Sequence, residues 1–239
     1  MICFLTSNPF LENGSLNPAN GFERTLLDSL PRRALRGLFV ASSPDAPETN
    51  AFYAAGQRAL FESAGIEFED FNILERASGG RAAEWVRRAD LMILSGGHVP
   101  TQNSFFQDIG LKALLTGFDG VLIGISAGTM NAAEVVYAQP ELEGEAVDPN
   151  YRRFLPGLGL TRTMVIPHFD GNMSYRLDGL RVWADVTFPD SIGRRFYALP
   201  DGSYLYLRDG VEELRGASWR IENGRIRLFS VDKERINIF

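Results

Sequence analysis

A serine held between two glycines is the first residue whose setting suggests chemistry. The stretch Gly124-Ile125-Ser126-Ala127-Gly128 follows an apolar run and precedes residues that favour a helix. It matches the Gly-x-Ser-x-Gly pattern, in which a sharp turn between a strand and a helix exposes the serine hydroxyl. Small neighbours let such a turn pack closely. Ser126 is therefore a candidate nucleophile, with the backbone N–H of Ala127 placed to bind a developing oxyanion.

Ser126 also has a purely structural interpretation. Serine is a preferred N-cap, because its hydroxyl accepts a hydrogen bond from a backbone N–H in the first turn of a helix. The five-residue pattern alone arises by chance on the order of 0.1 times in a chain of this composition. Taken by itself, the segment favours the cap and the nucleophile about equally.

A serine nucleophile needs a base, and the chain contains only two histidines. His168 follows the apolar segment MVIP, and His98 follows the pair Gly96-Gly97. Both lie at expected strand ends, although a lone histidine is more often a structural residue. The N–H groups of Gly96 and Gly97 are candidates for the rest of the oxyanion hole. A phosphate-binding loop is not expected there, because no Gly-Lys-Ser/Thr ending follows.

The elements that must position these residues alternate along the first half of the chain. Four short apolar runs predict strands buried on both faces of a sheet, namely 1–7, 37–43, 90–97 and 120–126. Amphipathic segments predict helices near 21–31, 48–65, 79–89 and 101–118, and from Ala127 onward. This order predicts an α/β fold with a doubly wound, mostly parallel sheet flanked by helices. Ligands of such folds bind beyond the carboxyl ends of the strands.

The second half of the chain is less regular. Residues 136–160 are punctuated by proline and glycine and predict a long surface loop, a candidate lid. Residues 163–169 predict a strand and 173–188 a helix. After Arg195, alternating segments joined by Asp-Gly and Asn-Gly predict a β-meander of hairpins. We expect a single domain, 1–239, of which about 196–239 form a β-rich extension.

Composition argues against several classes of protein. The 239 residues are 45% hydrophobic and 23% charged, as in ordinary globular chains. A net charge of −6 argues against nucleic acid or anionic membrane as the main partner. With no run near the ~20 apolar residues of a membrane span, no signal peptide and a single cysteine, a cytoplasmic location is expected. Two histidines without matching carboxylates support no metal site, and no cofactor is expected.

Several segments together resemble the peptidase E family of serine peptidases, which includes aspartyl dipeptidases and, more distantly, cyanophycinases. LMILSGG resembles the oxyanion turn of that family, and GVLIGISAGTMNAA resembles its nucleophile segment. FLPGLGLTRTMVIPHF resembles the segment that ends in its histidine, and YALPDGSYLYL the segment that carries its acid. The resemblance implies a class I glutamine amidotransferase-like fold, with Ser126 as nucleophile and His168 as base. A serine at this position argues against an amidotransferase.

The resemblance assigns the third triad position to Asp201, where the family carries a glutamate. Aspartate is one methylene shorter, yet Ser-His-Asp triads are competent in other hydrolases. Asp-Gly is also a common turn pair, which is the structural interpretation of Asp201. From the residues alone, the loop acids Glu141, Glu143 and Glu145 are equal alternatives for the third member.

The family also suggests a substrate. Aspartyl dipeptidases bind a free α-amino group and an acidic side chain, and the latter calls for a cation. Arg176 lies where similar enzymes carry an arginine for acid recognition, and a solvated arginine is the alternative. His98 has no family role; it either contacts the amino end of the substrate or shapes the rim of the site, and the structural role is favoured. The resemblance predicts a serine exopeptidase or dipeptidase for small peptides, with a preference for N-terminal Asp as a further expectation.

Two other functions remain as alternatives. One is a cyanophycinase-like hydrolase that cuts β-aspartyl-arginine units, and the other is a non-catalytic binding protein on the same scaffold. The sequence makes no prediction of oligomeric state.

Overall fold

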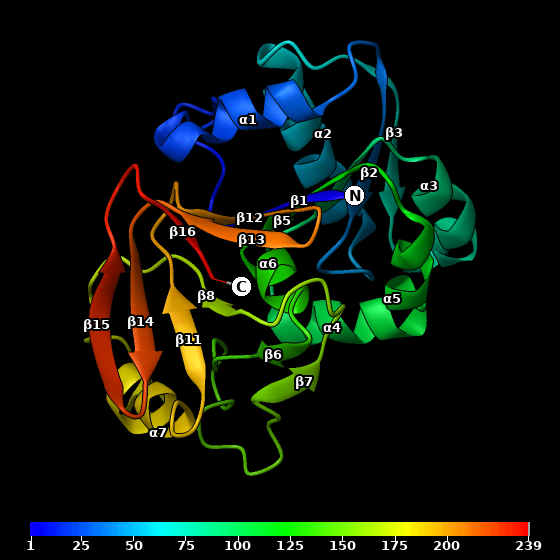
Figure 1. The fold of residues 1–239 in the computed structure, drawn as a ribbon. Coiled ribbons are helices and arrows are strands. Elements are labelled where there is room, and N and C mark those ends of the chain that lie inside the picture. Colours follow the sequence, from blue (N-terminus) through cyan, green and yellow to red (C-terminus); the bar gives the residue numbers. More distant parts are fainter. Residues whose placement is uncertain (239) are drawn as a thin grey trace.

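An eight-stranded sheet forms the centre of the computed structural model, which describes residues 1–238 (Figure 1). The strand order is β16-β13-β12-β1-β5-β4-β2-β3. Five neighbouring strands run parallel: β1 (Ile2–Thr6), β5 (Val121–Ile125), β4 (Leu91–Leu94), β2 (Leu35–Val40) and β3 (Phe68–Leu74). Three antiparallel strands extend the sheet beyond β1: β12 (Tyr204–Arg208), β13 (Val211–Arg215) and β16 (Arg235–Asn237).

Helices cover both faces of this sheet, as the alternation of apolar segments predicts. One face packs against α1 (Phe22–Ser29) and α2 (Pro47–Ser63). The other packs against α3 (Ala82–Arg88), α4 (Val99–Asp108) and α5 (Leu111–Leu114). Successive strand residues point to opposite faces, so in β1 Phe4 joins the first layer while Cys3 joins the second. Short 3-10 turns flank these helices at Ala19–Gly21, Arg76–Arg81 and Leu115–Gly117.

A second, four-stranded sheet stands beside the large one (Figure 1). Its order is β15-β14-β11-β8, formed by β8 (Met164–Ile166), β11 (Arg195–Ala198), β14 (Ser218–Glu222) and β15 (Arg225–Ser230). Strands β8 and β11 are parallel, and the others pair antiparallel. The chain leaves β11 in the small sheet and enters β12 in the large one. Residues 199–203 therefore connect the two sheets.

This connection corrects the predicted meander. Asp209-Gly210 joins β12 to β13, and Asn223-Gly224 joins β14 to β15, so these two hairpins are confirmed. All four residues have positive φ, as two-residue hairpin turns require. Asp201-Gly202 has the same sequence signal, but β11 and β12 belong to different sheets. Pairing of β12 with β1, far away in sequence, outweighs the local hairpin.

The helix predicted for 173–188 is also wrong in its first half. A short hairpin occupies that part, formed by β9 (Arg176–Leu177) and β10 (Leu180–Arg181) around Asp178-Gly179. A π-helix, Val182–Thr187, and α7 (Phe188–Asp190) follow. The turn-forming Asp-Gly pair outweighs the apolar periodicity. Upstream, the helix predicted for 101–118 breaks at Gly110, where φ is 63°.

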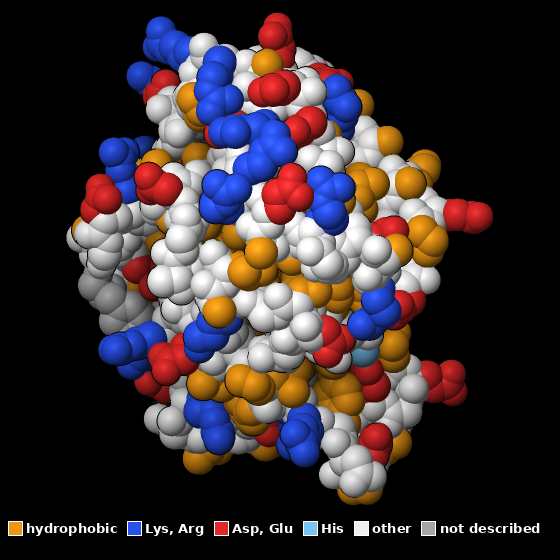
Figure 2. Space-filling view, turned by 90° about the vertical axis from the view of Figure 1, so that its right-hand side faces the viewer, with side chains coloured by type: hydrophobic (Ala, Val, Ile, Leu, Met, Phe, Trp, Pro, Cys, Tyr) orange, Lys and Arg blue, Asp and Glu red, His pale blue; other side chains and the backbone are white. Residues whose placement is uncertain are grey.

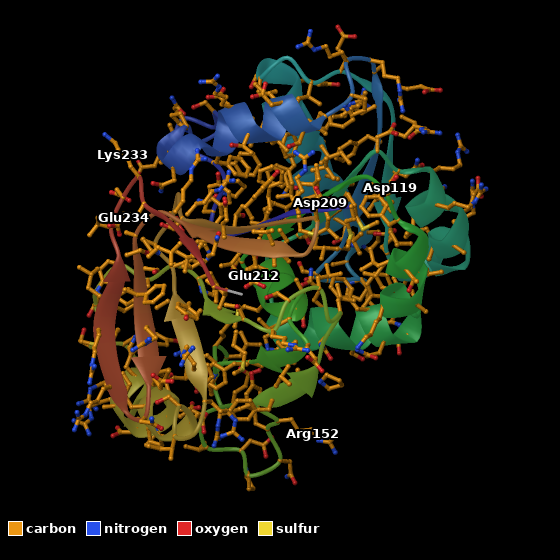
Figure 3. The ribbon with its side chains drawn as sticks, in the orientation of Figure 1. Asp119, Arg152, Asp209, Glu212, Lys233 and Glu234 are labelled. Atoms are coloured by element: carbon orange, nitrogen blue, oxygen red, sulfur yellow. The ribbon has the colours of Figure 1, made fainter. Side chains whose placement is uncertain are left out.

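The long loop predicted for 136–160 is held at both ends by a small two-stranded sheet. Its strands are β6 (Val135–Tyr137) and β7 (Phe154–Pro156). Just beyond it, the Thr161 hydroxyl donates to Glu212 of β13 at 2.7 Å, which ties this region to the large sheet. Glu212 is labelled in Figure 3. None of the helices in residues 1–238 combines the length and apolarity needed to cross a bilayer.

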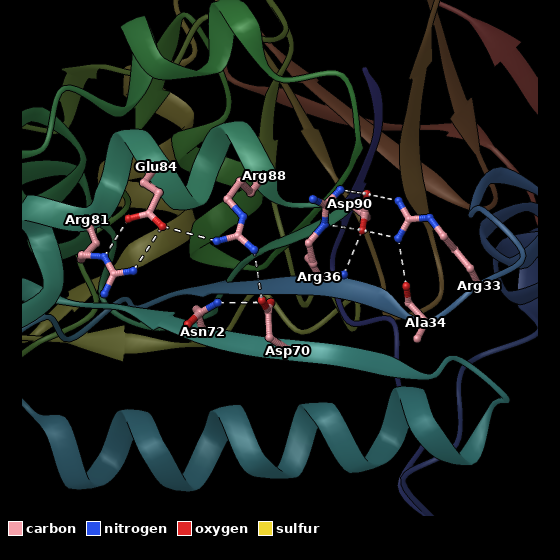
Figure 4. A network of polar contacts seen from close by, with 9 residues as sticks. All are labelled: Arg33, Ala34, Arg36, Asp70, Asn72, Arg81, Glu84, Arg88 and Asp90. Atoms are coloured by element: carbon pink, nitrogen blue, oxygen red, sulfur yellow. Dashed lines mark hydrogen bonds and ion pairs between the residues drawn. The ribbon is translucent and has the colours of Figure 1, made fainter.

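Ion pairs hold together the end of the sheet at which β2 and β4 begin. Asp90, directly before β4, binds the guanidinium groups of Arg33 and Arg36 (Figure 4). A neighbouring group joins Glu84 to Arg81 and Arg88. Figure 2, which views the side of α3 and β3, shows Lys and Arg side chains grouped with Asp and Glu. This edge lies opposite the strand ends from which the candidate site is built.

Candidate active site

The predicted crevice lies at the carboxyl ends of the parallel strands. Ser7 follows β1, Ser42 follows β2, Gly96 follows β4 and Ser126 follows β5. A cleft of about 570 Å³ opens there, and its lining includes Ser42, Gly96, Ser126 and also His168. Adjacent parallel strands end at the same edge, which explains why residues so distant in sequence meet.

Ser126 sits on a strained turn between β5 and α6 (Ala127–Asn131). Its φ is 50° and its ψ is −110°, a conformation that side-chain-bearing residues rarely adopt. Ser126 occupies the N-cap position, but its side chain makes no capping hydrogen bond. Capping therefore does not account for the serine at this position. Strain at a strand-to-helix turn is the feature that the Gly-x-Ser-x-Gly pattern predicts.

The glycines around Ser126 are required by close packing. A Cβ on Gly124 would lie 2.9 Å from the Thr129 hydroxyl oxygen, and a Cβ on Gly128 would clash with the Leu94 carbonyl. The second clash shows that the start of α6 presses against the end of β4. Only glycine at 128 lets the turn approach so closely.

The glycine pair after β4 lies against the same turn. A Cβ on Gly96 would be 3.4 Å from the Cβ of Ser126, and Gly97 has a φ of 151°. The Ser42 hydroxyl donates to the Gly96 carbonyl at 2.6 Å, which holds the pair in place. Ala127 opens α6 next to Ser126. The residues predicted to form an oxyanion hole therefore gather around the serine.

His168 and Asp201 contact each other directly. His168 Nδ1 lies 2.8 Å from Asp201 Oδ1. The Ser7 hydroxyl donates to that same oxygen at 2.8 Å, and Asn8 Nδ2 donates to Oδ2 at 3.3 Å. The hydrogen bond from His168 lowers the pKa of Asp201, burial opposes this, and Ser7 and Asn8 lower it further. The carboxylate is thus held in its charged form beside the imidazole.

Ser7 also positions the histidine backbone. The N–H of His168 donates to the Ser7 hydroxyl at 2.7 Å, and His168 has a positive φ of 57°. Neither Ser7 nor Asn8 was among the site residues predicted from the sequence. The available signal was the polar TSN that ends the first apolar strand, at the same sheet edge as the other strand ends.

The site forms where the two sheets meet. Ser126 follows a strand of the large sheet, whereas His168 and Asp201 follow the parallel strands β8 and β11 of the small one. Ser126 and His168 line the same cleft. Within residues 1–238, no hydrogen bond joins their side chains. Hydrogen bonds between a nucleophile and its base are often long or poorly aligned before a substrate binds.

Comparison with known proteins identifies the family of the chain. A family model described as peptidase family S51 matches residues 11–214, which include the strained serine, His168 and Asp201. The chain belongs to peptidase family S51. It is therefore a serine peptidase, and the resemblance to the peptidase E family is confirmed.

Solved structures show the same fold. A peptidase from an acI-B1 Actinobacterium has a TM-score of 0.65 and 18% identity, covering 99% of this chain and 96% of that one. A peptidase E protein from Listeria monocytogenes EGD-e has a TM-score of 0.59 and 16% identity, covering 96% of this chain and 98% of that one. These structures confirm the predicted α/β architecture of the S51 peptidase. No curated protein shows a significant sequence match.

The loop acids of this S51 peptidase do not contact His168 as Asp201 does. Glu145 Oε1 lies 2.7 Å from His98 Nε2, and Glu145 Oε2 accepts the backbone N–H groups of Glu141 and Leu142 at 2.9 Å each. Burial opposes the charge of Glu145, but these N–H groups and His98 together lower its pKa. Glu145 thus ties the loop to the residue that follows the glycine pair.

Glu141 lies in the electric field of both histidines. Desolvation has the largest effect and raises the pKa of the Glu141 carboxyl, and the nearby charge of Glu145 also raises it. The charges of His98 and His168 act in the opposite direction and lower this pKa. Glu143 is exposed. In the part of the chain described, His168 Nδ1 is therefore hydrogen-bonded to Asp201 and to none of the three loop acids.

Arg176 is not brought into the cleft. It lies on β9 with an exposed side chain, and its guanidinium donates to the carbonyl of Gly179 at 3.3 Å. It is not among the residues that line the cleft. Among residues 1–238, no group of three or more His, Cys, Asp or Glu is arranged to hold a metal ion.

Proposed function

We propose that this S51 peptidase is a serine exopeptidase or dipeptidase that hydrolyses small peptides through Ser126, His168 and Asp201. The observation that carries the proposal is the 2.8 Å contact between Asp201 and His168 Nδ1, in a cleft shared with the strained Ser126. A carboxylate on Nδ1 leaves Nε2 free to accept a proton from a serine hydroxyl.

The mechanism follows from these positions. Ser126 Oγ attacks the scissile carbonyl while His168 Nε2 takes its proton and then delivers it to the leaving amine. Asp201 holds the imidazole in the correct tautomer and stabilises its cation. The N–H groups of Ala127 and of Gly96 or Gly97 bind the oxyanion. Water, deprotonated by His168, then releases the acyl group and restores the serine.

The size and chemistry of the cleft support a small substrate. Its volume of about 570 Å³ lies within the range of small-molecule sites. A preference for N-terminal Asp depends on Arg176, which lies outside the lining. No Lys, Arg, Asp or Glu from the described residues lines the cleft, so these residues offer no oppositely charged partners for a zwitterionic β-aspartyl-arginine unit.

Labelling with a serine-directed phosphonate, together with dipeptide hydrolysis, tests the proposal. The wild type should be labelled within residues 121–134. Ser126→Ala should abolish labelling, and Ser126→Ala and His168→Ala should each lower kcat/KM by on the order of 10³-fold or more. Ser63→Ala is the matched control, because that serine only bonds Leu60 on the exposed surface of α2. Labelling elsewhere, or activity retained in Ser126→Ala, would refute the assignment.

A further inference from the structure

One wall of the cleft is a face of α2. Thr49, Tyr53 and Gln57 are spaced four residues apart and all line the cleft, together with Asn50. Residues four apart project from the same side of a helix, so this wall is continuous. Every one of these side chains is uncharged. The wall offers hydroxyl and amide groups where an acid-selective pocket would need a cation.

Aromatic side chains also line this pocket. Phe10 and Phe39 line it, and Phe39 is only 2% exposed. Tyr53 is 57% exposed and packs edge-to-face on Phe52, which is 75% exposed, with ring centroids 5.6 Å apart. Exposed aromatic residues beside a cleft supply apolar surface for a ligand. The pocket therefore combines an apolar lining with a polar helix wall.

Charge near the histidine is negative. Asp201 contacts His168, and Glu141 lies close enough for its carboxyl to respond to the charge of His168. No Lys or Arg of the described residues lines the cleft to balance a carboxylate on the substrate. An acidic side chain would lose its hydration without gaining a cationic partner.

Two polar atoms of the lining residues lack partners within residues 1–238. They are Gln57 Oε1 and Ser95 Oγ, both buried, and Ser95 is only 3% exposed. Buried polar atoms are satisfied in most native structures, and an exception at a cleft calls for an explanation. The Gln57 carbonyl lacks a hydrogen-bond donor among these residues. A half turn of its amide about the terminal torsion exchanges Oε1 with Nε2, and the carbonyl can then accept a hydrogen bond from a ligand in the cleft.

We propose that this pocket selects an uncharged aromatic side chain with a hydrogen-bond donor at its tip, so that tyrosine is preferred at the residue supplying the scissile carbonyl. The ring packs against Phe10, Phe39 and Tyr53, and its hydroxyl donates to Gln57 Oε1. This inference rests on the proposed serine peptidase function. It replaces selection of an acidic first residue by selection of a neutral one.

Three matched dipeptides test the pocket: Tyr-Leu, Phe-Leu and Asp-Leu. For the wild type we expect kcat/KM on Tyr-Leu to exceed that on Phe-Leu about tenfold, because only tyrosine pairs with Gln57. Asp-Leu should be the poorest of the three. In Gln57→Leu, the Tyr/Phe ratio of kcat/KM should fall to about one, because the tyrosine hydroxyl loses its acceptor.

Gln107→Leu is the matched control, because Gln107 is an exposed α4 residue that bonds Pro156 and lies outside the cleft lining. It should keep the wild-type ratio. A wild type that prefers Asp-Leu, or a Tyr/Phe ratio unchanged in Gln57→Leu, overturns the inference. The wild-type ratios test it even if the variant does not fold.

Phosphonate labelling separates this inference from the proposed function. A protein that is labelled at Ser126 but cleaves Tyr-Leu no better than Asp-Leu has the proposed chemistry without the proposed pocket. A protein that is not labelled and cleaves none of the three dipeptides fails the proposed function itself, and the pocket inference falls with it.

Discussion

The backbone N–H of His168 donates a hydrogen bond to the hydroxyl of Ser7 at 2.7 Å. That hydroxyl donates in turn to Asp201 Oδ1, the same oxygen that lies 2.8 Å from His168 Nδ1. Ser7 is fully buried and follows β1 of the large sheet, whereas the other two follow strands of the small one. A single hydroxyl therefore positions histidine and carboxylate relative to the sheet that carries Ser126.

Replacing Ser7 by alanine should slow catalysis more than it weakens binding. Ser7→Ala leaves the His168 N–H without its acceptor and removes one donor from Asp201, a loss of about 1–3 kcal/mol. We expect kcat to fall about tenfold or more with KM little changed, measured on the best dipeptide. Ser203→Ala is the control in the neighbouring turn, because the Ser203 hydroxyl is buried without a partner in residues 1–238. Equal losses in both variants would contradict the positioning role.

The stability of the protein at low pH should depend on the charge of Asp201. Its contact with His168 holds its pKa below the ordinary value of 3.8. A carboxyl whose pKa is lowered in the folded state stabilises the protein at any pH above its ordinary pKa. This contribution is lost as the pH falls through the lowered pKa. Urea unfolding should show wild type more stable than Asp201→Asn at neutral pH, with the gap closing below pH 3.8. A gap that widens on acidification would reverse the sign of the argument.

The sequence predicts those parts of the site that depend on neighbouring residues. Ser126 and the pair Gly96-Gly97 each follow a short apolar strand, and the parallel order of such strands places their ends at one edge. The elbow needs only a strand, small residues and a helix in succession. These features are local, so one amino-acid sequence is enough to recognise them.

Contacts between segments that are distant in the sequence could not be predicted from local patterns. The bond between Ser7 and His168 joins residues 161 positions apart, and no periodicity encodes it. Asp201 was selected only through the family resemblance, because the residues alone left the loop acids equal to it. Its Asp-Gly pair also suggested a hairpin, although the turn joins two sheets. Which strand β12 pairs with is decided by burial against β1, a property of the whole fold.

Gly128 should be among the least replaceable residues of the elbow. A Cβ there would clash with the Leu94 carbonyl, which belongs to rigid backbone. Gly128→Ala should cost about 1–3 kcal/mol of unfolding free energy and lower kcat by displacing Ser126. Gly56→Ala is a control of opposite sign, because a Cβ on Gly56 in α2 meets nothing within 4 Å. It should stabilise the protein by about 0.5–1 kcal/mol. Thermal unfolding and kinetics of both variants check this, and a neutral Gly128→Ala would rule out the close approach.

The contact between His98 and Glu145 should restrain the 138–153 segment. Glu145 also accepts two backbone N–H groups of that segment, and these bonds with His98 lower its pKa against the effect of burial. In Glu145→Gln the charge is lost, so amide exchange across 139–150 should accelerate and kcat/KM should fall severalfold. Glu143→Gln, at an exposed site in the same loop, should change neither. Unchanged exchange in Glu145→Gln would show that the contact does not hold the loop.

The ion pairs at the opposite edge of the sheet should affect stability without affecting catalysis. Asp90, whose side chain is 12% exposed, binds Arg33 in two places and also accepts the backbone N–H of Arg36 (Figure 4). Burial opposes its charge, but the hydrogen bonds from Arg33 and Arg36 bring its pKa well below the ordinary value.

Asp90→Asn should therefore lower the unfolding free energy by about 1–3 kcal/mol at neutral pH, since two guanidinium groups lose a charged partner. This difference in unfolding free energy should shrink as the pH falls below 3.8, because the wild-type carboxylate becomes protonated as the pH approaches its lowered pKa. Asp119→Asn is the matched control: that side chain is fully exposed and pairs with the N-terminus at 3.1 Å, so its replacement should leave the unfolding free energy almost unchanged. Because Asp90 lies at the end of β4 remote from Ser126, kcat should stay unchanged at temperatures where the variant is folded. A change in kcat without a loss of stability would mean that this edge communicates with the cleft.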